Sequence, residues 1–219
     1  MRIFERYTNA DYEDYYDFKK NFRINAPDDF NFAFDVVDVL AKEQPDKEAM
    51  LWIGITGEEK RFTFRDFSVL SNRAANMFRS LGIRKGDMVM LILKRRYEFW
   101  ISMLALHKIG AIAIPATHLL TKKDIVYRNN YGDVKAIVCL DEGEIADHVE
   151  AAVPESTTLK TIILVNGKRE GWISWDEEMG KQNEEFMRPE GAGKTYLRDP
   201  MLMFFTSGTT GMPKMVLHN

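Results

Sequence analysis

Apolar residues in the middle of this chain form short continuous runs that alternate with stretches of helical periodicity. The continuous runs predict strands buried on both faces, at residues 88–93, 111–114, 136–140 and 161–165. The periodic stretches predict helices at residues 98–108, 122–129 and 142–152. Strands that alternate with helices in this way favour parallel crossovers. The pattern therefore predicts a doubly wound α/β fold, a mostly parallel sheet with helices on both faces.

The region before this alternation has elements of its own. Residues 11–24 predict a helix with an aromatic stripe, and residues 32–44 predict a second amphipathic helix that stops near Pro45. Apolar runs at 49–55 and 61–64 flank a glycine-containing turn and predict a β-hairpin. Helix starts are predicted where a hydroxyl or carboxylate side chain can cap the first turn: Thr63 with Asp66, Thr121 with Asp124, and Asp141.

The pattern divides the chain into four parts. Residues 1–30 are interpreted as an N-terminal helical extension and residues 31–170 as an α/β subdomain. Residues 171–199 are polar and rich in glycine and proline, which predicts an irregular connecting segment. Residues 200–219 contain a last strand, at 201–205, and a loop that begins an incomplete second part.

Composition and charge narrow the classes of partner. The 219 residues include 30 Lys and Arg against 33 Asp and Glu, a net charge of −3, so no basic field favours nucleic acid or a membrane surface. Residues 99–116 are mostly apolar, but His107 and Lys108 interrupt them, so they predict a buried helix and strand rather than a membrane span. The single cysteine, Cys139, excludes an internal disulfide and lies in a predicted core strand. The N-terminus lacks the features of a signal or transit peptide, from which we expect a cytoplasmic protein.

The most chemically suggestive segment follows the last predicted strand. Four hydroxyl side chains and two glycines occur within residues 206–211, and Lys214 comes shortly after them. Small residues let successive backbone N–H groups converge on an anion, while hydroxyls add donors and a lysine adds positive charge. The candidate phosphate-binding residues are Thr206, Ser207, Gly208, Thr209, Thr210, Gly211, Met212, Pro213 and Lys214.

Two alternatives bear on this segment. Composition alone leaves open a Gly/Ser/Thr-rich surface hairpin with no ligand. The segment is not a Walker A loop, because Pro213 precedes Lys214 and Met215 follows it. A second fragment at 193–195 has a Walker-like Gly-Lys-Thr ending, but Arg188 stands where the first glycine belongs, so we assign no phosphate role to Lys194.

Residues 205–214 are similar to the signature phosphate loop of the adenylate-forming enzymes, which include acyl-CoA synthetases, luciferase and the adenylation domains of peptide synthetases. Residues 62–75 resemble the opening strand and helix of that family, and residues 81–87 resemble the turn before its first buried strand. The resemblance covers the chain from about Phe32 onward. Residues 110–128 and the Lys214-Met215 pair are most similar to the acetyl and medium-chain acyl-CoA synthetase branch.

The resemblance implies a two-step reaction. A carboxylic acid, from acetate to a medium-chain fatty acid, attacks the α-phosphate of ATP, and the thiol of CoA then displaces AMP from the acyl-adenylate. Residues 206–210 and Lys214 would hold the β- and γ-phosphates, with Mg²⁺ neutralising their charge. No catalytic side chain is expected in this chain, because the substrates carry both nucleophiles.

Other polar residues are assigned lesser roles. Arg95 and Arg96 follow the carboxyl end of a predicted strand, where α/β sheets bind ligands, and are weak candidates for a CoA phosphate; a solvated loop is the alternative. His218 has no carboxylate partner in the sequence and is not assigned as a base. No metal site is expected, because no Met cluster is interleaved with His or Cys at ligand spacing.

The resemblance also implies a longer protein, because members of the family continue well beyond the phosphate loop. We therefore expect the chain to be an N-terminal part of an AMP-forming acyl-CoA ligase that is inactive alone and self-associates through uncovered apolar surface near residues 201–205 and 215–217. The alternative is a stand-alone nucleotide- or phosphate-binding module without catalysis.

Overall fold

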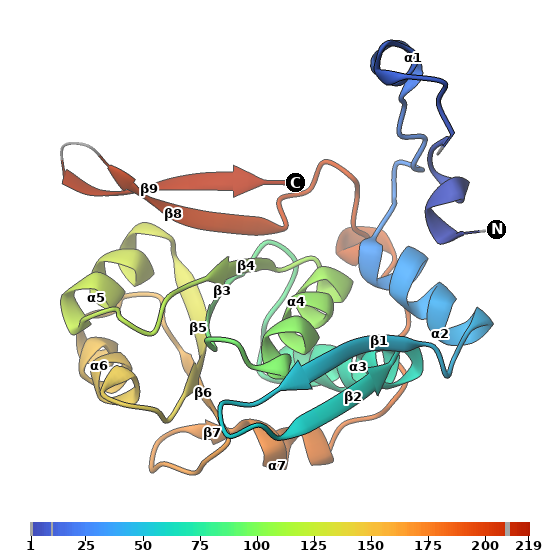
Figure 1. Ribbon diagram of the computed structural model, residues 1–219. Helices are drawn as coiled ribbons and strands as arrows, with labels where there is room; N and C mark the ends of the chain where they lie inside the picture. Colours follow the sequence, from blue (N-terminus) through green and yellow to red (C-terminus); the bar gives the residue numbers. More distant parts are fainter. Residues whose placement is uncertain (1, 10, 209–210) are drawn as a thin grey trace.

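A seven-stranded, mostly parallel sheet forms the centre of the fold (Figure 1). The computed structural model describes residues 2–9, 11–208 and 211–219. The sheet order is β7-β6-β5-β3-β4-β8-β9, with strands β3 (Met88–Ile92), β4 (Ile112–Pro115), β5 (Val134–Leu140), β6 (Thr161–Val165), β7 (Ile173–Ser174), β8 (Leu202–Gly208) and β9 (Gly211–His218). Neighbouring strands are parallel except β8 and β9, which form an antiparallel pair.

Helices cover both faces of this sheet. Val89 and Leu91 of β3 point into a core formed with α3 (Phe64–Ser80), α4 (Tyr97–Ile109) and α7 (Trp175–Gly180). Met90 and Ile92, the intervening residues, point into a second core formed with α5 (Lys122–Tyr131) and α6 (Ile145–Ala152). Both faces of a strand are apolar because both are buried. The predicted doubly wound architecture is confirmed.

Two of the three predicted helix caps are present. The Thr63 and Asp66 side chains form a capping box at α3, and Thr121 and Asp124 form one at α5. The prediction for Asp141 is wrong, because α6 begins at Ile145 after Gly143, whose φ is 64°. A short 3₁₀ helix, η3 (Val153–Glu155), follows α6.

The N-terminal region is held to the body near Tyr7, whose hydroxyl donates to the Asp35 carbonyl at 3.2 Å, and projects from the body further along. It contains η1 (Ile3–Arg6) and α1 (Tyr15–Asn21), and α1 stands away from the rest of the molecule in Figure 1. The Tyr7 ring contacts the Phe30 ring edge-on, with centroids 4.9 Å apart. The helix predicted over residues 11–24 is shorter than expected, because only Tyr15–Asn21 is helical, and it buries no residue. A helix without tertiary packing is marginal at this length.

The second amphipathic helix and the hairpin are present as predicted. The helix combines a π-helical stretch, η2 (Ala33–Asp38), with α2 (Val39–Glu43). The hairpin pairs β1 (Glu48–Ile53) with β2 (Glu59–Thr63) in a separate antiparallel sheet.

A buried lysine ties the N-terminal helices to the body. The Lys108 ammonium on α4 is fully buried and lies 2.8 Å from Asp38 Oδ1 and 2.6 Å from Asn72 Oδ1. Burial lowers the pKa of Lys108, and the Asp38 carboxylate opposes that change. The ion pair joins η2, α3 and α4 in one packed unit.

The connecting segment is more regular than predicted. Residues 173–180 form β7, which extends the sheet beside β6, and α7, which buries Trp175 and Met179 in the first core. A short 3₁₀ helix, η4 (Gly191–Gly193), follows. The expectation of an irregular segment over 171–199 is wrong in this part, while the division of the chain into four parts stays an interpretation.

The apolar stretch at 99–116 folds as α4 and β4, in agreement with the sequence. No helix in the described part of the chain combines the length and apolar character needed to cross a membrane.

Candidate functional site

The predicted phosphate-binding segment forms the far end of the β8–β9 hairpin. Thr206 and Ser207 belong to β8, whereas Met212, Pro213 and Lys214 belong to β9. Thr206 is the register partner of Lys214, and its hydroxyl donates to the Lys214 carbonyl at 3.4 Å. Gly208 pairs with Gly211. Thr209 and Thr210, which were also predicted to bind phosphate, lie outside the described residues.

This arrangement differs from the expected loop. β8 continues three residues beyond the predicted strand end at Phe205, and β9 begins at Gly211 in antiparallel pairing with it. The segment is thus a Gly/Ser/Thr-rich hairpin, as the ligand-free alternative also predicts. Thr206, Ser207 and Lys214 remain exposed at its end. Hydroxyls, backbone N–H groups and an ammonium group are the donors that bind a phosphate.

Helix α5 contacts the hairpin on the side that faces the body. The Tyr127 hydroxyl donates to the Pro213 carbonyl at 2.8 Å, and the Tyr127 ring contacts the Phe205 ring edge-on at 6.3 Å between centroids. The Arg128 guanidinium lies 5.2 Å from the centroid of the Phe205 ring. These contacts fix the side of the hairpin that faces the body.

Lys194, in the Walker-like fragment, has a structural role. Its ammonium lies 3.0 Å from the Asp29 carboxylate, which raises the pKa of Lys194. The neighbouring Thr195 is buried and accepts a hydrogen bond from the Asn31 amide at 3.1 Å. Both contacts fasten the N-terminal segment to residues 194–195.

The second candidate region, with Arg95 and Arg96, lines an open groove of about 710 Å³. The Arg96 guanidinium is engaged by Glu98 at 2.7 Å, which raises the pKa of Arg96, and lies over the Trp52 and Tyr97 rings. Arg95 is exposed, and its carbonyl accepts a hydrogen bond from the Trp52 indole at 2.7 Å. Of the two arginines, Arg95 is therefore better placed to meet an anion in the groove.

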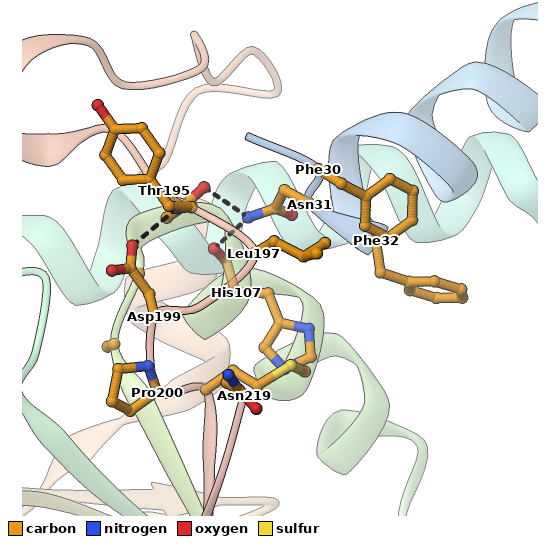
Figure 2. Close-up of a pocket in the computed structure, with 13 residues that line it drawn as sticks. Phe30, Asn31, Phe32, His107, Thr195, Leu197, Asp199, Pro200 and Asn219 are labelled. Atoms are coloured by element: carbon orange, nitrogen blue, oxygen red, sulfur yellow. Dashed lines mark hydrogen bonds between the residues drawn. The ribbon is translucent and has the colours of Figure 1, made fainter. Parts of the chain in front are cut away.

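A cavity of about 210 Å³ that sequence analysis missed lies between the N-terminal segment, α4 and residues 195–201 (Figure 2). The Asn31 amide bridges the Thr195 hydroxyl and the His107 carbonyl, as the dashed lines in Figure 2 show. Both His107 ring nitrogens are buried without a hydrogen-bond partner among the described residues, and burial lowers the pKa of His107 to about 4. The imidazole is therefore neutral near pH 7. The residues of this cavity are remote in sequence, so no local pattern indicates it.

The remaining single-residue assignments can be compared with the structure. Cys139 is fully buried in β5, as predicted, and burial raises the pKa of its thiol to about 12. His218 ends β9, and its ring contacts the Phe204 ring at 5.8 Å between centroids. No group of three or more His, Cys, Asp or Glu side chains suited to a metal ion occurs within residues 2–9, 11–208 and 211–219.

Curated proteins that are similar in sequence to this chain are named acyl-coenzyme A synthetases. The acyl-coenzyme A synthetase ACSM4 of Homo sapiens is 38% identical over 212 residues, covering 93% of this chain and 36% of that protein. The rat ACSM4 protein is 36% identical, covering 88% of this chain and 33% of its own length. The ACSM3 protein of Pongo abelii is 34% identical, covering 96% of this chain and 36% of that protein. The chain thus spans about a third of the length of the curated relatives it matches.

These relatives correct one expectation. All three are named as mitochondrial proteins, which contradicts the cytoplasmic location expected from the N-terminus.

Solved structures and a family model agree with the fold. The anthranilate CoA ligase AuaEII, solved with anthranoyl-AMP, has a TM-score of 0.74 at 24% identity, covering 88% of this chain and 35% of that one. An acyl-CoA synthetase of Brucella canis has a TM-score of 0.71 at 25% identity, covering 86% of this chain and 33% of that one. The model of the AMP-binding enzymes matches residues 37–219 and so includes the whole β8–β9 hairpin. The resemblance inferred from the motif is confirmed, and the chain belongs to the AMP-binding enzyme family.

Proposed function

We propose that this chain is the N-terminal part of an AMP-forming acyl-CoA ligase. The complete enzyme would activate a carboxylic acid with ATP to an acyl-adenylate and then transfer the acyl group to CoA. The observation that carries the proposal is the family match through a hairpin whose end presents hydroxyls and a lysine at exposed positions. Its relatives are named acyl-coenzyme A synthetases.

The hairpin residues would act by binding and orientation. Thr206 and Ser207 would donate to the β- and γ-phosphates, and Lys214 would add a positive charge. Thr209 and Thr210 belong to the same proposal through the sequence motif alone. Because pyrophosphate gains charge as it leaves, donors held in place lower the barrier to adenylate formation.

No side chain of this chain needs to act as a nucleophile. The carboxylate of the acid attacks the α-phosphate, the bond to the β-phosphate oxygen breaks, and the CoA thiol later displaces AMP. Mg²⁺ would bind through oxygen ligands that include the phosphates of ATP, which neutralises part of their charge. In this proposal the hydroxyl and ammonium groups of the hairpin bind the phosphates of ATP and do not themselves enclose Mg²⁺.

CoA would meet the chain at the groove beside β3. Arg95 is exposed in a groove that His118 also lines, and an exposed guanidinium is suited to a phosphate. Arg96 would contribute less, because Glu98 already engages its guanidinium. The charge and exposure of Arg95 support this assignment.

The acid substrate is proposed to range from acetate to a medium-chain fatty acid. The test is incorporation of labelled pyrophosphate into ATP by the full-length protein, measured with acetate, butyrate, octanoate and palmitate. Exchange that requires one of the first three acids supports the proposal. Absence of exchange with every acid, in a protein that binds ATP, would favour the alternative of a module without catalysis, which no present observation favours.

A further inference from the structure

The β8–β9 hairpin joins the sheet near the start of β8 and meets α5 further along. The register between β4 and β8 is a single residue pair, Ala113 with Leu202, and the Ala113 N–H donates to the Met201 carbonyl at 3.1 Å. Beyond that pair, β8 and β9 hydrogen-bond to each other along their length. A two-stranded ribbon held to a sheet at one end is free to pivot unless something supports its other end.

Contacts from α5 provide that support. Met203 and Phe205, alternate residues of β8, face the end of α5: a Cβ on Gly132 would lie 3.2 Å from Met203 Cε and 3.6 Å from Phe205 Cζ. In Figure 1 the hairpin extends over the body toward the side on which α5 lies. Glycine at position 132 lets the ribbon approach this closely.

The contact nearest the hairpin end is polar and directional. The Tyr127 hydroxyl donates to the Pro213 carbonyl at 2.8 Å, one residue before Lys214. The opposing strand places Thr206 against Lys214. A hydrogen bond at Pro213 therefore constrains both strands at the level of the hydroxyl and ammonium groups assigned to phosphate binding.

We propose that Tyr127 is a positioning residue that holds the phosphate-binding hairpin in register with the nucleotide. The inference rests on the proposed function. Tyr127 acts through the Pro213 carbonyl and does not itself contact substrate. Removing its hydroxyl lets the hairpin end pivot, and misplacement by about 1 Å at such a site can cost about a hundredfold in rate.

A structural role alone makes a different prediction. The Tyr127 ring also stacks on Tyr131, with centroids 5.4 Å apart and planes inclined by 12°. Tyr127→Phe keeps this ring and its contact with Phe205 while removing only the hydroxyl. Tyr131→Phe makes the same chemical change one helical turn further on and serves as the matched control, since Tyr131 is largely exposed.

The experiment uses the full-length protein and separates the two half-reactions. Tyr127→Phe is expected to slow acid-dependent pyrophosphate exchange by about tenfold or more and to raise the KM for ATP. Transfer to CoA from a preformed acyl-adenylate and the melting temperature are expected to match those of Tyr131→Phe. Hydrogen exchange is expected to speed up in the β9 amides and not in β5 or β6.

Two results would overturn the inference. If Tyr127→Phe and Tyr131→Phe behave alike, or if both half-reactions fall in parallel with the melting temperature, Tyr127 does not position the hairpin. A wild-type protein that binds ATP but shows no acid-dependent exchange would refute the proposed function, and this inference with it, so the two failures are distinguishable.

Discussion

His107 makes the stability of this fold sensitive to mildly acidic conditions. Its ring nitrogens are buried between α4 and residues 195–201 without partners among the described residues, and burial lowers its pKa from 6.5 to about 4. Well above pH 6.5 the imidazole is neutral in both the folded and the unfolded chain. As the pH falls from 6.5 toward 4, His107 binds a proton in the unfolded chain but not in the folded chain, so the free energy of unfolding decreases over that range.

The magnitude follows from the pKa difference. At 1.36 kcal/mol for each unit of pKa, lowering it from 6.5 to about 4 corresponds to about 3 kcal/mol of unfolding free energy. About 2 kcal/mol of this is lost between pH 7.5 and pH 5. Carboxylates also titrate below pH 5, so the contribution of His107 has to be isolated by a variant.

The perturbation is His107→Leu, which fills similar space and cannot take up a proton. Urea denaturation at pH 7.5 and pH 5 gives the unfolding free energy of both proteins. The wild type is expected to lose about 2 kcal/mol more than the variant between these pH values. His218→Leu, at an exposed position, is the control. Parallel losses in wild type and His107→Leu would refute the reasoning.

Three further predictions concern the core and the surface. Lys108→Ala is expected to lower the unfolding free energy by about 3 to 5 kcal/mol, because Asp38 loses its buried cation; denaturation that shows a loss below about 1 kcal/mol would contradict this. Cys139 is expected to react with a thiol reagent at pH 8 only as fast as the chain unfolds, since burial raises its pKa to about 12; rapid labelling of the folded chain would contradict it. Exposed Phe204, Val216 and Leu217 are expected to cause self-association, and a clean monomer in light scattering at high concentration would count against it.

The central sheet was predictable because its strands are continuous apolar runs. Residues 161–165 form β6 with the predicted bounds, and β3 differs from its predicted range by one residue. Because both faces of these strands are buried, their sequences are continuously apolar, unlike the sequence of an amphipathic helix. The helices between the strands then favour parallel crossovers. Local pattern and tertiary environment agree in this part of the chain.

The errors arose where local pattern and packing disagree. β7 has two residues, too short to leave a pattern, yet Ser174 followed by Trp175 and Met179 was a readable signal for the capped helix α7. The aromatic stripe of residues 11–24 is typical of a longer helix, but only seven residues are helical, and α1 buries none of them in the part of the chain that the structure describes. In these segments tertiary contacts, or their scarcity, decided the outcome.

The candidate site was predictable in its residues and less so in its geometry. The hydroxyl-rich motif indicates phosphate chemistry, but glycine and proline have low strand propensity, so the sequence does not indicate that β8 extends to Gly208 or that residues 211–218 form β9. The support from Tyr127 joins residues 86 positions apart and leaves no local signal. Phosphate binding by the hairpin remains a prediction.

The most direct test of the account is a comparison of half-reactions in the full-length protein with Lys214→Ala. Because the hairpin is proposed to meet charge on the departing pyrophosphate, acid-dependent exchange of pyrophosphate into ATP is predicted to fall by about a hundredfold or more. CoA transfer from a preformed acyl-adenylate is predicted to change little. Equal losses in the two half-reactions, tracking the melting temperature, would contradict the assignment of the hairpin to phosphate binding.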